Sequence, residues 1–276
     1  MKKLTTLLVA MLFTAGMAFA QSNSATVDQQ GVSNDTQVDQ QGTMNSADVT
    51  QVNGFNEVVL NQSSNTSGSS TAVIEQIVTG SATASRGQDV LLDQTGLNSA
   101  DIYQRGAGNK VLNYDGTSAA VQTSTTTLNT LDIDQRSGWS EAFVEQYVGG
   151  NSATVDQSGG NNFVASILQN SGDNTASVVQ TGGNSTADVQ QLGIGGHTAT
   201  VNQGVDFQDG AFEVDIIQDG LGNNSLVNQN NGDGSYGNIF QNGDMNMTTL
   251  TQTGLNQTSD VDQVGNNNVA SVTQSN

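Results

Sequence analysis

Polar and apolar residues alternate along most of this chain in a seven-residue pattern, which Asn151–Gln157 shows most clearly. The first residue is Asn or Ser, the third is small and apolar, the fifth is branched and apolar, and the seventh is Gln. In a β-strand, residues two apart share a face. The first, third, fifth and seventh residues would therefore face one way, and Ser152, Thr154 and Asp156 the other. This period favours a half-buried strand over a helix.

The pattern recurs at steps of about eleven residues, and this period determines the expected fold. It is regular in residues 23–62, interrupted in 63–128 and regular again in 129–276. Short connectors such as Ser158–Gly160 join the copies, and their glycines predict tight turns with positive φ. A strand followed by such a turn fits either a meander or a coil of alternate strands. The coil is favoured because it stacks like residues on like.

We therefore expect an all-β fold, a β-solenoid of two parallel sheets with roughly ten coils. Gln157 would lie on Gln135, Asn151 on Asn129, and Val155 on Ile133, with layers about 4.8 Å apart. An inward amide without a hydrogen bond costs about 1–3 kcal/mol, so burying Asn and Gln is favourable only in a repeated stack. The ladder of the core is expected to contain Asn23, Gln29, Asn34, Gln40, Asn45, Gln51, Gln62, Gln146, Asn151, Gln157, Asn174, Gln180, Gln252, Gln263, Asn268 and Gln274.

Two stretches between residues 109 and 127 do not follow the pattern. In the unit Asn109–Asp115, Asn113 stands where a branched apolar residue belongs, and Asp115 replaces the final Gln. Residues 117–127 form a run rich in Ser and Thr, for which a loop and a degraded strand are equally good interpretations.

Residues 1–20 have the features of a secretory signal peptide. Lys2 and Lys3 precede an apolar run, and Ala18–Ala20 resembles a cleavage site before Gln21. No later segment is apolar over the length that a membrane-spanning helix needs.

Without residues 1–20 the chain has four basic and 26 acidic residues, a net charge of 4 − 26 = −22. This charge argues against a nucleic acid partner, because phosphate binding depends on Lys and Arg. The chain has no Cys, so hydrogen bonds rather than disulfides must stabilise it.

The unit Asn-Ser-Ala-Thr-Val-Asp-Gln, followed by a glycine turn and a second Asn-x-Ala-x-Val-x-Gln, resembles the curlin repeat over residues 23–274. Curlins are the subunits of curli, secreted bacterial amyloid fibres of the biofilm matrix. The resemblance implies an extracellular, self-polymerising subunit for adhesion. It also implies export through a dedicated outer-membrane pore and handling by a nucleator and accessory factors.

Two departures from curlins affect these expectations. Curlins usually carry a leader between the signal peptide and the repeats, whereas the repeats here begin at once, at Asn23, and run to Gln274. The interrupted region 63–128 has no place in a compact curlin and is expected to loop out. The final unit, Asn268–Gln274, lacks the basic character of a nucleator, which favours the major subunit, with the nucleating subunit as the alternative.

Candidate chemistry is sparse. His197 is the single histidine and occupies the Asn position of its unit, so no metal, cofactor or catalytic relay is expected. Trp139 fits a local turn cover better than a sugar-stacking site. Outward carboxylates would bind cations, restrain premature assembly or confer solubility: Asp28, Asp39, Asp48, Asp156, Asp188 and Asp262. An enzyme on a β-helix would need clustered catalytic residues, and an ice-binding solenoid or soluble adhesin is the remaining rival.

Overall fold

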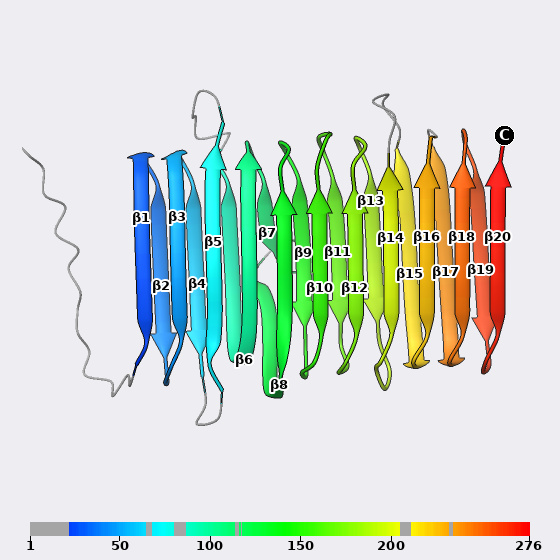
Figure 1. Ribbon diagram of the computed structural model, residues 1–276, viewed down its shortest axis with the longest axis horizontal. Coiled ribbons are helices and arrows are strands. Elements are labelled where there is room, and N and C mark those ends of the chain that lie inside the picture. The colour runs from blue at the N-terminus through cyan, green and yellow to red at the C-terminus, as the bar shows by residue number, and fades with distance from the viewer. Residues whose placement is uncertain are drawn as a thin grey trace, which may run out of the picture.

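The protein is a β-solenoid of about ten coils, which confirms the fold expected from the repeat (Figure 1). The computed structural model describes residues 22–64, 68–79, 87–113, 116, 118–204, 211–231 and 234–276, and the named elements within these ranges are all β-strands. The predicted signal peptide, residues 1–20, lies outside the described residues, as does Asp115.

Alternate strand segments pair in parallel to form two stacks, which we name A and B. Stack A contains β1 (Ser24–Val32), β3 (Ser46–Gly54), β5 (Ser70–Val78), the second part of β6 (Asp89–Gly106), the second part of β8 (Ala120–Gln135), β10 (Ser152–Gln157), β12 (Thr175–Gln180), β14 (Thr198–Gly204), β16 (Asn224–Asn230), β18 (Met247–Thr253) and β20 (Val269–Ser275). Stack B contains β2 (Asp35–Gln41), β4 (Glu57–Ser63), the first part of β6, β7 (Lys110–Leu112) with the first part of β8, β9 (Glu141–Gln146), β11 (Val164–Gln169), β13 (Thr186–Gln191), β15 (Phe212–Leu221), β17 (Ser235–Asp244) and β19 (Thr258–Val264). In Figure 1 the strands of stack A point up and those of stack B point down.

The register places like residues on like, as the period predicts. Gln157 lies opposite Gln135 in the neighbouring layer, and Val155 lies opposite Ile133. Inward positions of the inner layers are buried, and Val155 is only 1% exposed. The branched and small apolar residues of both stacks fill the space between the sheets in one continuous core. Because the pairs are parallel and in register, the structure is the coil and not the meander.

The turns place one residue with positive φ immediately before the first residue of most units. Glycine does this at Gly150, before Asn151, with φ of 83°. At other turns the position holds a side chain that rarely adopts this conformation, as at Met44, Trp139 and Met245. Asn and Asp occupy it elsewhere in the chain. The turn thus has a fixed backbone shape that the stack imposes on whatever residue stands there.

The interrupted region 63–128 is part of the stack, so the expectation that it loops out is wrong. β5 pairs with β3, and β6 runs from stack B into stack A. Strand pairing with the regular layers on either side holds these segments, because each of them still provides inward apolar residues such as Ile74 and Leu92.

One layer of stack B is assembled from two pieces of sequence. β7 supplies its first half and pairs with Asp89 and Val90 of β6. The second half comes from the start of β8, where Gln122 lies opposite Gln94. Between these halves Asn113 and Ser118 lie side by side. The backbone N–H of Asn113 donates to the carbonyl oxygen of Ser118, and that of Ser118 donates to the side-chain oxygen of Asn113. Ser and Thr at 123–127 therefore belong to a strand rather than a loop.

This arrangement predicts that residues 113–119 can be removed. Their deletion joins Leu112 to Ala120 and creates the uninterrupted unit Asn-Lys-Val-Leu-Ala-Val-Gln. We expect the shortened chain to fold with equal or slightly higher stability, because the layer keeps its inward residues Asn109, Val111, Ala120 and Gln122 and a loop is lost. The denaturant midpoint of the two chains measures this. Deleting seven residues within the layer of β10, 151–157, serves as the control and should unfold that region; loss of structure in both deletions would contradict the split layer.

Candidate functional site

Two columns of inward glutamines run along the described solenoid, one in each stack, and those of the inner layers are buried. In stack A the column contains Gln29, Gln51, Gln76, Gln104, Gln135, Gln157, Gln180, Gln203, Gln229, Gln252 and Gln274. In stack B it contains Gln40, Gln62, Gln94, Gln122, Gln146, Gln169, Gln191, Gln218, Gln241 and Gln263. Each glutamine donates from Nε2 to Oε1 of the next, over 2.7–3.0 Å.

Each glutamine also links the two stacks. Gln157 in stack A donates to Gln180 Oε1 at 2.9 Å and to the carbonyl oxygen of Glu141 in stack B at 3.1 Å. Its own Oε1 accepts from Gln135 at 2.8 Å. The second N–H of the amide is therefore used across the core, and the first along the axis. Such a fully satisfied network is worth more than its separate bonds, because each bond polarises the next.

The amide ladders have a direction. In both columns the N–H group points toward the layer nearer the C-terminus, and the bonds to backbone carbonyls fix which end of each amide is nitrogen. At the end formed by β1 and β2, the oxygens of Gln29 and Gln40 have no donor among the described residues. At the other end, Gln263 and Gln274 each keep one N–H without a ladder acceptor there.

A further column, which we call the first-position column, contains the first residue of each unit of stack A. Asn23, Asn45, Asn151, Asn174 and Asn268 of the sequence prediction belong to it, and Asn34 has the equivalent place in stack B. The side-chain oxygen of Asn151 accepts from the backbone N–H of Asn174, one layer on, at 3.1 Å. Its Nδ2 donates to the carbonyl of Tyr147, four residues earlier. Asn at this position thus closes its own turn and binds the next one.

His197 replaces asparagine in this column and makes the same two contacts. Its Nδ1 accepts from the backbone N–H of Asn223 at 3.2 Å, while Nε2 lies 2.6 Å from the carbonyl oxygen of Leu192 and donates to it. The ring is fully buried. Burial lowers the pKa of His197 from its ordinary value, although the Leu192 carbonyl and Asp219 favour the charged form. A protonated ring could not accept from Asn223, so the neutral form fits the column.

Sequence reasoning missed one ladder glutamine and several first-position residues of stack B. Gln122 was hidden by the split of its repeat. In stack B the first position holds Ser140, Phe163, Ser185, Phe212 and Ser235, all buried, so large and small side chains alternate along the axis. A phenyl ring that is wider than one layer is accommodated by a Ser in each neighbouring layer. The alternation in sequence was the available signal, because these residues all stand six positions before a ladder glutamine.

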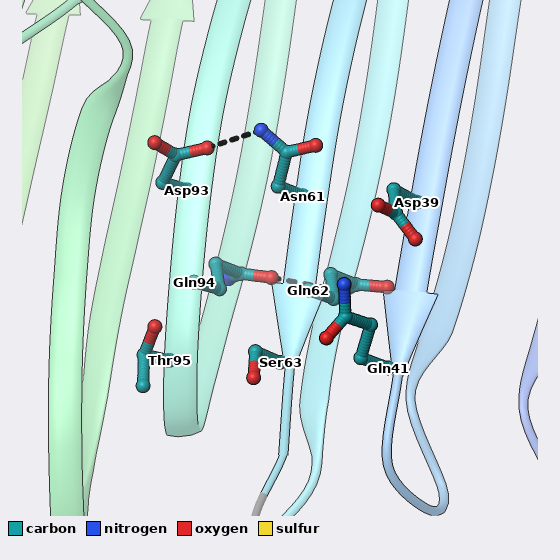
Figure 2. A pocket seen from close by; sticks show the side chains of 8 residues that line it. All are labelled: Asp39, Gln41, Asn61, Gln62, Ser63, Asp93, Gln94 and Thr95. Carbon is teal, nitrogen blue, oxygen red and sulfur yellow. Dashed lines mark hydrogen bonds between the residues drawn. The ribbon is translucent and has the colours of Figure 1, made fainter. Parts of the chain in front are cut away.

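The outward face carries rows of polar and acidic side chains. Figure 2 shows one row, in which Asp39, Asn61 and Asp93 stand in successive layers of stack B, with Asn61 donating to Asp93 at 2.6 Å. The row borders an open groove of about 240 Å³ next to the ladder pair Gln62 and Gln94. The six outward carboxylates of the sequence prediction are all at least partly exposed. These side chains interact with solvent and with one another.

Stacking also brings like charges close together on the outward face of stack A. Asp132 lies opposite Asp101 in one neighbouring layer and opposite Thr154 in the other. Partial burial raises the pKa of Asp132, and the carboxylates of Asp101, Asp134 and Asp156 raise it further. Acidic side chains on this face therefore repel one another across the layers.

Among the described residues, two ion pairs offset some of the outward negative charge. Lys110 pairs with Glu141 at 3.1 Å, and Arg136 pairs with Asp134. The described residues contain no group of three or more His, Asp or Glu side chains that could hold a metal ion.

Trp139 covers part of the neighbouring layer. Its ring lies over Gly108, where a Cβ would come within 2.7 Å of the indole, and the side chain is 50% exposed. This arrangement fits the local cover that the sequence favoured. Within the described part of the chain, no helix is long and apolar enough to cross a membrane.

Comparison with known families decides what this repeat is. The curlin associated repeat matches residues 20–52, 127–159 and 150–182. The chain is a curlin-repeat protein. A search of curated proteins gives no match. The matched segments include β1, β2, most of β3, and β9 to β12, whose ladder residues stack in register. Together, the curlin repeat and the solenoid indicate a structural protein rather than an enzyme.

A buried glutamine of this curlin-repeat protein should be far less replaceable than an outward residue of the same strand. In Gln157→Ala, Gln135 loses its acceptor and Gln180 its donor, and a cavity remains. We expect the free energy of unfolding to fall by about 2–4 kcal/mol. Thr154→Ala is the matched control in β10 and should change it by less than about 0.5 kcal/mol. Denaturant titration measures both, and equal losses would refute the importance of the ladder.

The curlin-repeat protein should also lose stability in mild acid through His197. Because the pKa is lowered by folding, the unfolded chain binds this proton first. The stability from the neutral ring is present in full above about pH 6.5 and is lost as the pH falls from there through the lowered pKa. His197→Asn should remove this part of the pH dependence and keep both column contacts. Unfolding midpoints at pH 7.5 and pH 5 measure it; identical pH dependence in the two chains would contradict the role of His197.

Proposed function

We propose that this curlin-repeat protein is the structural subunit of an extracellular amyloid fibre that assembles end to end and serves adhesion and the biofilm matrix. The observation that carries the proposal is the state of the two terminal layers. Their ladders are incomplete in a complementary way, with acceptors at one end and donors at the other. The curlin repeat supports the same conclusion, because curli fibres are built from such subunits.

Most inward residues of the terminal strands β1, β2 and β20 are incompletely buried by the described chain, whereas Val261 and Gln263 of β19 are buried. Gln29 is exposed and Val27 is only partly buried, although the equivalent Gln51 and Val49 one layer in are fully buried. The same holds at the opposite end, where Val272 and Gln274 are partly buried. A second molecule stacked on either end would cover these residues and gain roughly 25 cal/mol for each Å² of apolar surface removed from water.

The outer edges of the terminal strands also carry free backbone groups. Among the described residues, β1 pairs only with β3, β2 only with β4, β19 only with β17 and β20 only with β18, so the outer edges of these four strands are unpaired. Exposed edges of this length recruit other strands unless a protein blocks them. The seven-residue strands β2, β19 and β20 and the nine-residue β1 are long, so each contact would form a full parallel ladder.

The direction of the amide ladders supports head-to-tail growth. The free N–H groups of Gln263 and Gln274 match the free oxygens of Gln29 and Gln40, whereas two like ends would place donor against donor or acceptor against acceptor. A head-to-tail contact that does not close on itself generates an open filament. The fibre would therefore be polar, with a different residue set at each growing end.

The outward acidic rows would restrain this assembly. Like charges face each other across some of the layers, as at Asp101 and Asp132 and at Asp188 and Asp215. Charged residues beside aggregation-prone strands slow unwanted pairing. We further propose that the signal peptide at residues 1–20 directs export, and that a curli-type secretion pore and a nucleator with accessory factors act as partners. The favoured role is that of the major subunit.

Dilution of residues 21–276 from denaturant tests the fibre. We expect a lag, then growth of thioflavin T fluorescence and fibres visible by electron microscopy. A chain that folds but stays monomeric for days at tens of micromolar would instead support a soluble adhesin or ice-binding solenoid.

The terminal glutamines should control the rate of growth. Replacing Gln29, Gln40, Gln263 and Gln274 by Ala removes two ladder bonds at each junction. At about 1 kcal/mol for each bond, seeded elongation should slow by roughly tenfold or more. The control replaces outward neutral residues of the same four strands, Ser24, Gln37, Thr258 and Thr273, by Ala. If both sets slow elongation equally, the ladder is not what joins the subunits.

A further inference from the structure

The described chain enters and leaves the solenoid through the same stack. Its first strand, β1, and its last strand, β20, both belong to stack A. Stack A accordingly has eleven ladder glutamines in the described residues and stack B has ten, from Gln40 to Gln263. This inequality constrains how a second copy can be added, and the inference below rests on the proposed fibre.

Simple translation along the axis would leave a gap. If β1 of an incoming subunit lay on β20, its β2 would face β19. Layers within one stack are about 4.8 Å apart, and successive strands of the coil rise by half of that. The distance from β19 to the incoming β2 would then be about 9.6 Å, which is one strand too wide. Gln263 and Gln40 could not meet, and both strand edges would stay unpaired.

A half-turn about the long axis removes this gap. Strands of stack A point up and those of stack B point down in Figure 1, so the half-turn lays the stack A of one copy on the stack B of another with parallel strands. We propose that successive subunits in the fibre are related by a half-turn about its axis, so that β1 of the incoming subunit pairs with β19 and its β2 pairs with β20. Each junction then continues the coil as if the chain were unbroken.

Both stacks use the same seven-residue unit, so the inward residues match at this junction. Gln263 meets Gln29 of the incoming subunit, and Gln274 meets its Gln40, which completes both ladders. In the same register Val261 meets Val27, and Val272 meets Val38. These valines are partly buried in the isolated molecule, except for Val261, which is 7% exposed. The contacts have the same form as those between neighbouring layers within the chain.

The outward face offers a second consequence of the half-turn. It sets Asp262 of one subunit beside Asp28 of the next, whereas translation sets Thr273 beside Asp28. The chain already contains such stacked acidic pairs, as Asp188 lies opposite Asp215. Asp262→Asn should therefore speed seeded elongation at low salt, and the gain should shrink as salt screens the repulsion. No gain from Asp262→Asn would contradict the half-turn.

Disulfide formation distinguishes the two junctions directly, because the chain has no native cysteine. In the half-turn Thr26 of the incoming subunit lies opposite Asp260, and in translation it lies opposite Ser271. One double variant combines Thr26→Cys and Asp260→Cys, and a second combines Thr26→Cys and Ser271→Cys. All three side chains are exposed. The paired positions lie at opposite ends of a stack about 50 Å long, so any disulfide must join two molecules.

Fibres are grown under reducing conditions, oxidised and dissolved in denaturant. Their chains are then separated by size in a gel without reductant. We expect a series of disulfide-linked dimers and larger multimers from the Thr26 and Asp260 pair, and few linked chains from the Thr26 and Ser271 pair. Gln37→Cys with Ser271→Cys should also link chains, since the half-turn joins β2 to β20. Thr154→Cys with Ser177→Cys is the positive control, because these residues are neighbours within one chain.

The outcomes separate this inference from the proposed function. Linking by the Thr26 and Ser271 pair alone would overturn the half-turn and leave the fibre intact. Fibres in which neither terminal pair links, while the internal control oxidises, would overturn the end-to-end contact in this register. If the unaltered chain forms no fibre, the proposed function fails, and the half-turn fails with it.

Discussion

A buried amide must have hydrogen-bond partners, and in this molecule the partner of each core amide is the same group one layer away. Leaving one such group unpaired costs about 1–3 kcal/mol, whereas each bond that forms contributes about 1 kcal/mol net. A single repeat could not bury Gln157 at all. Neighbouring layers make its burial favourable, since Gln135 and Gln180 satisfy both ends of its amide. Strand register, turn position and spacing all follow from keeping these amides aligned.

The same constraint explains which departures the solenoid accepts. His197 replaces Asn because its two ring nitrogens supply one acceptor and one donor in nearly the same places. Phe163 is accepted because a small residue, Ser185, follows it in the next layer. The interruption between Leu112 and Ala120 is accepted because Ala120 takes the next position of the same unit, with Gln122 in the ladder. By contrast, Gln88 in the place of Asn leaves its Oε1 without a partner among the described residues.

Repetition also makes the ends of the stack unlike its middle. Every ladder glutamine of an interior layer is hydrogen-bonded to a glutamine on both sides, while each one in a terminal layer of the described chain has such a neighbour on one side. Since all ladder amides point the same way, the two ends are complementary rather than identical, and a second copy is the surface that fits them best. The acidic outer rows act against this attraction, so the rate of assembly depends on the balance between an inward hydrogen-bonded ladder and outward charge repulsion.

The sequence by itself determined the fold class, the inward face and the register, because a period of two within an eleven-residue repeat leaves one way to bury Gln157 and Val155. It failed where one layer is built from separated pieces: residues 109–112 and 120–122 form a unit only because β6 and β9 hold them side by side. Tertiary structure alone decided the direction of the amides, since that depends on carbonyls such as that of Glu141, which belong to the opposite stack. It also decided that the described chain begins and ends in the same stack, because that requires knowing which irregular segments contribute a layer.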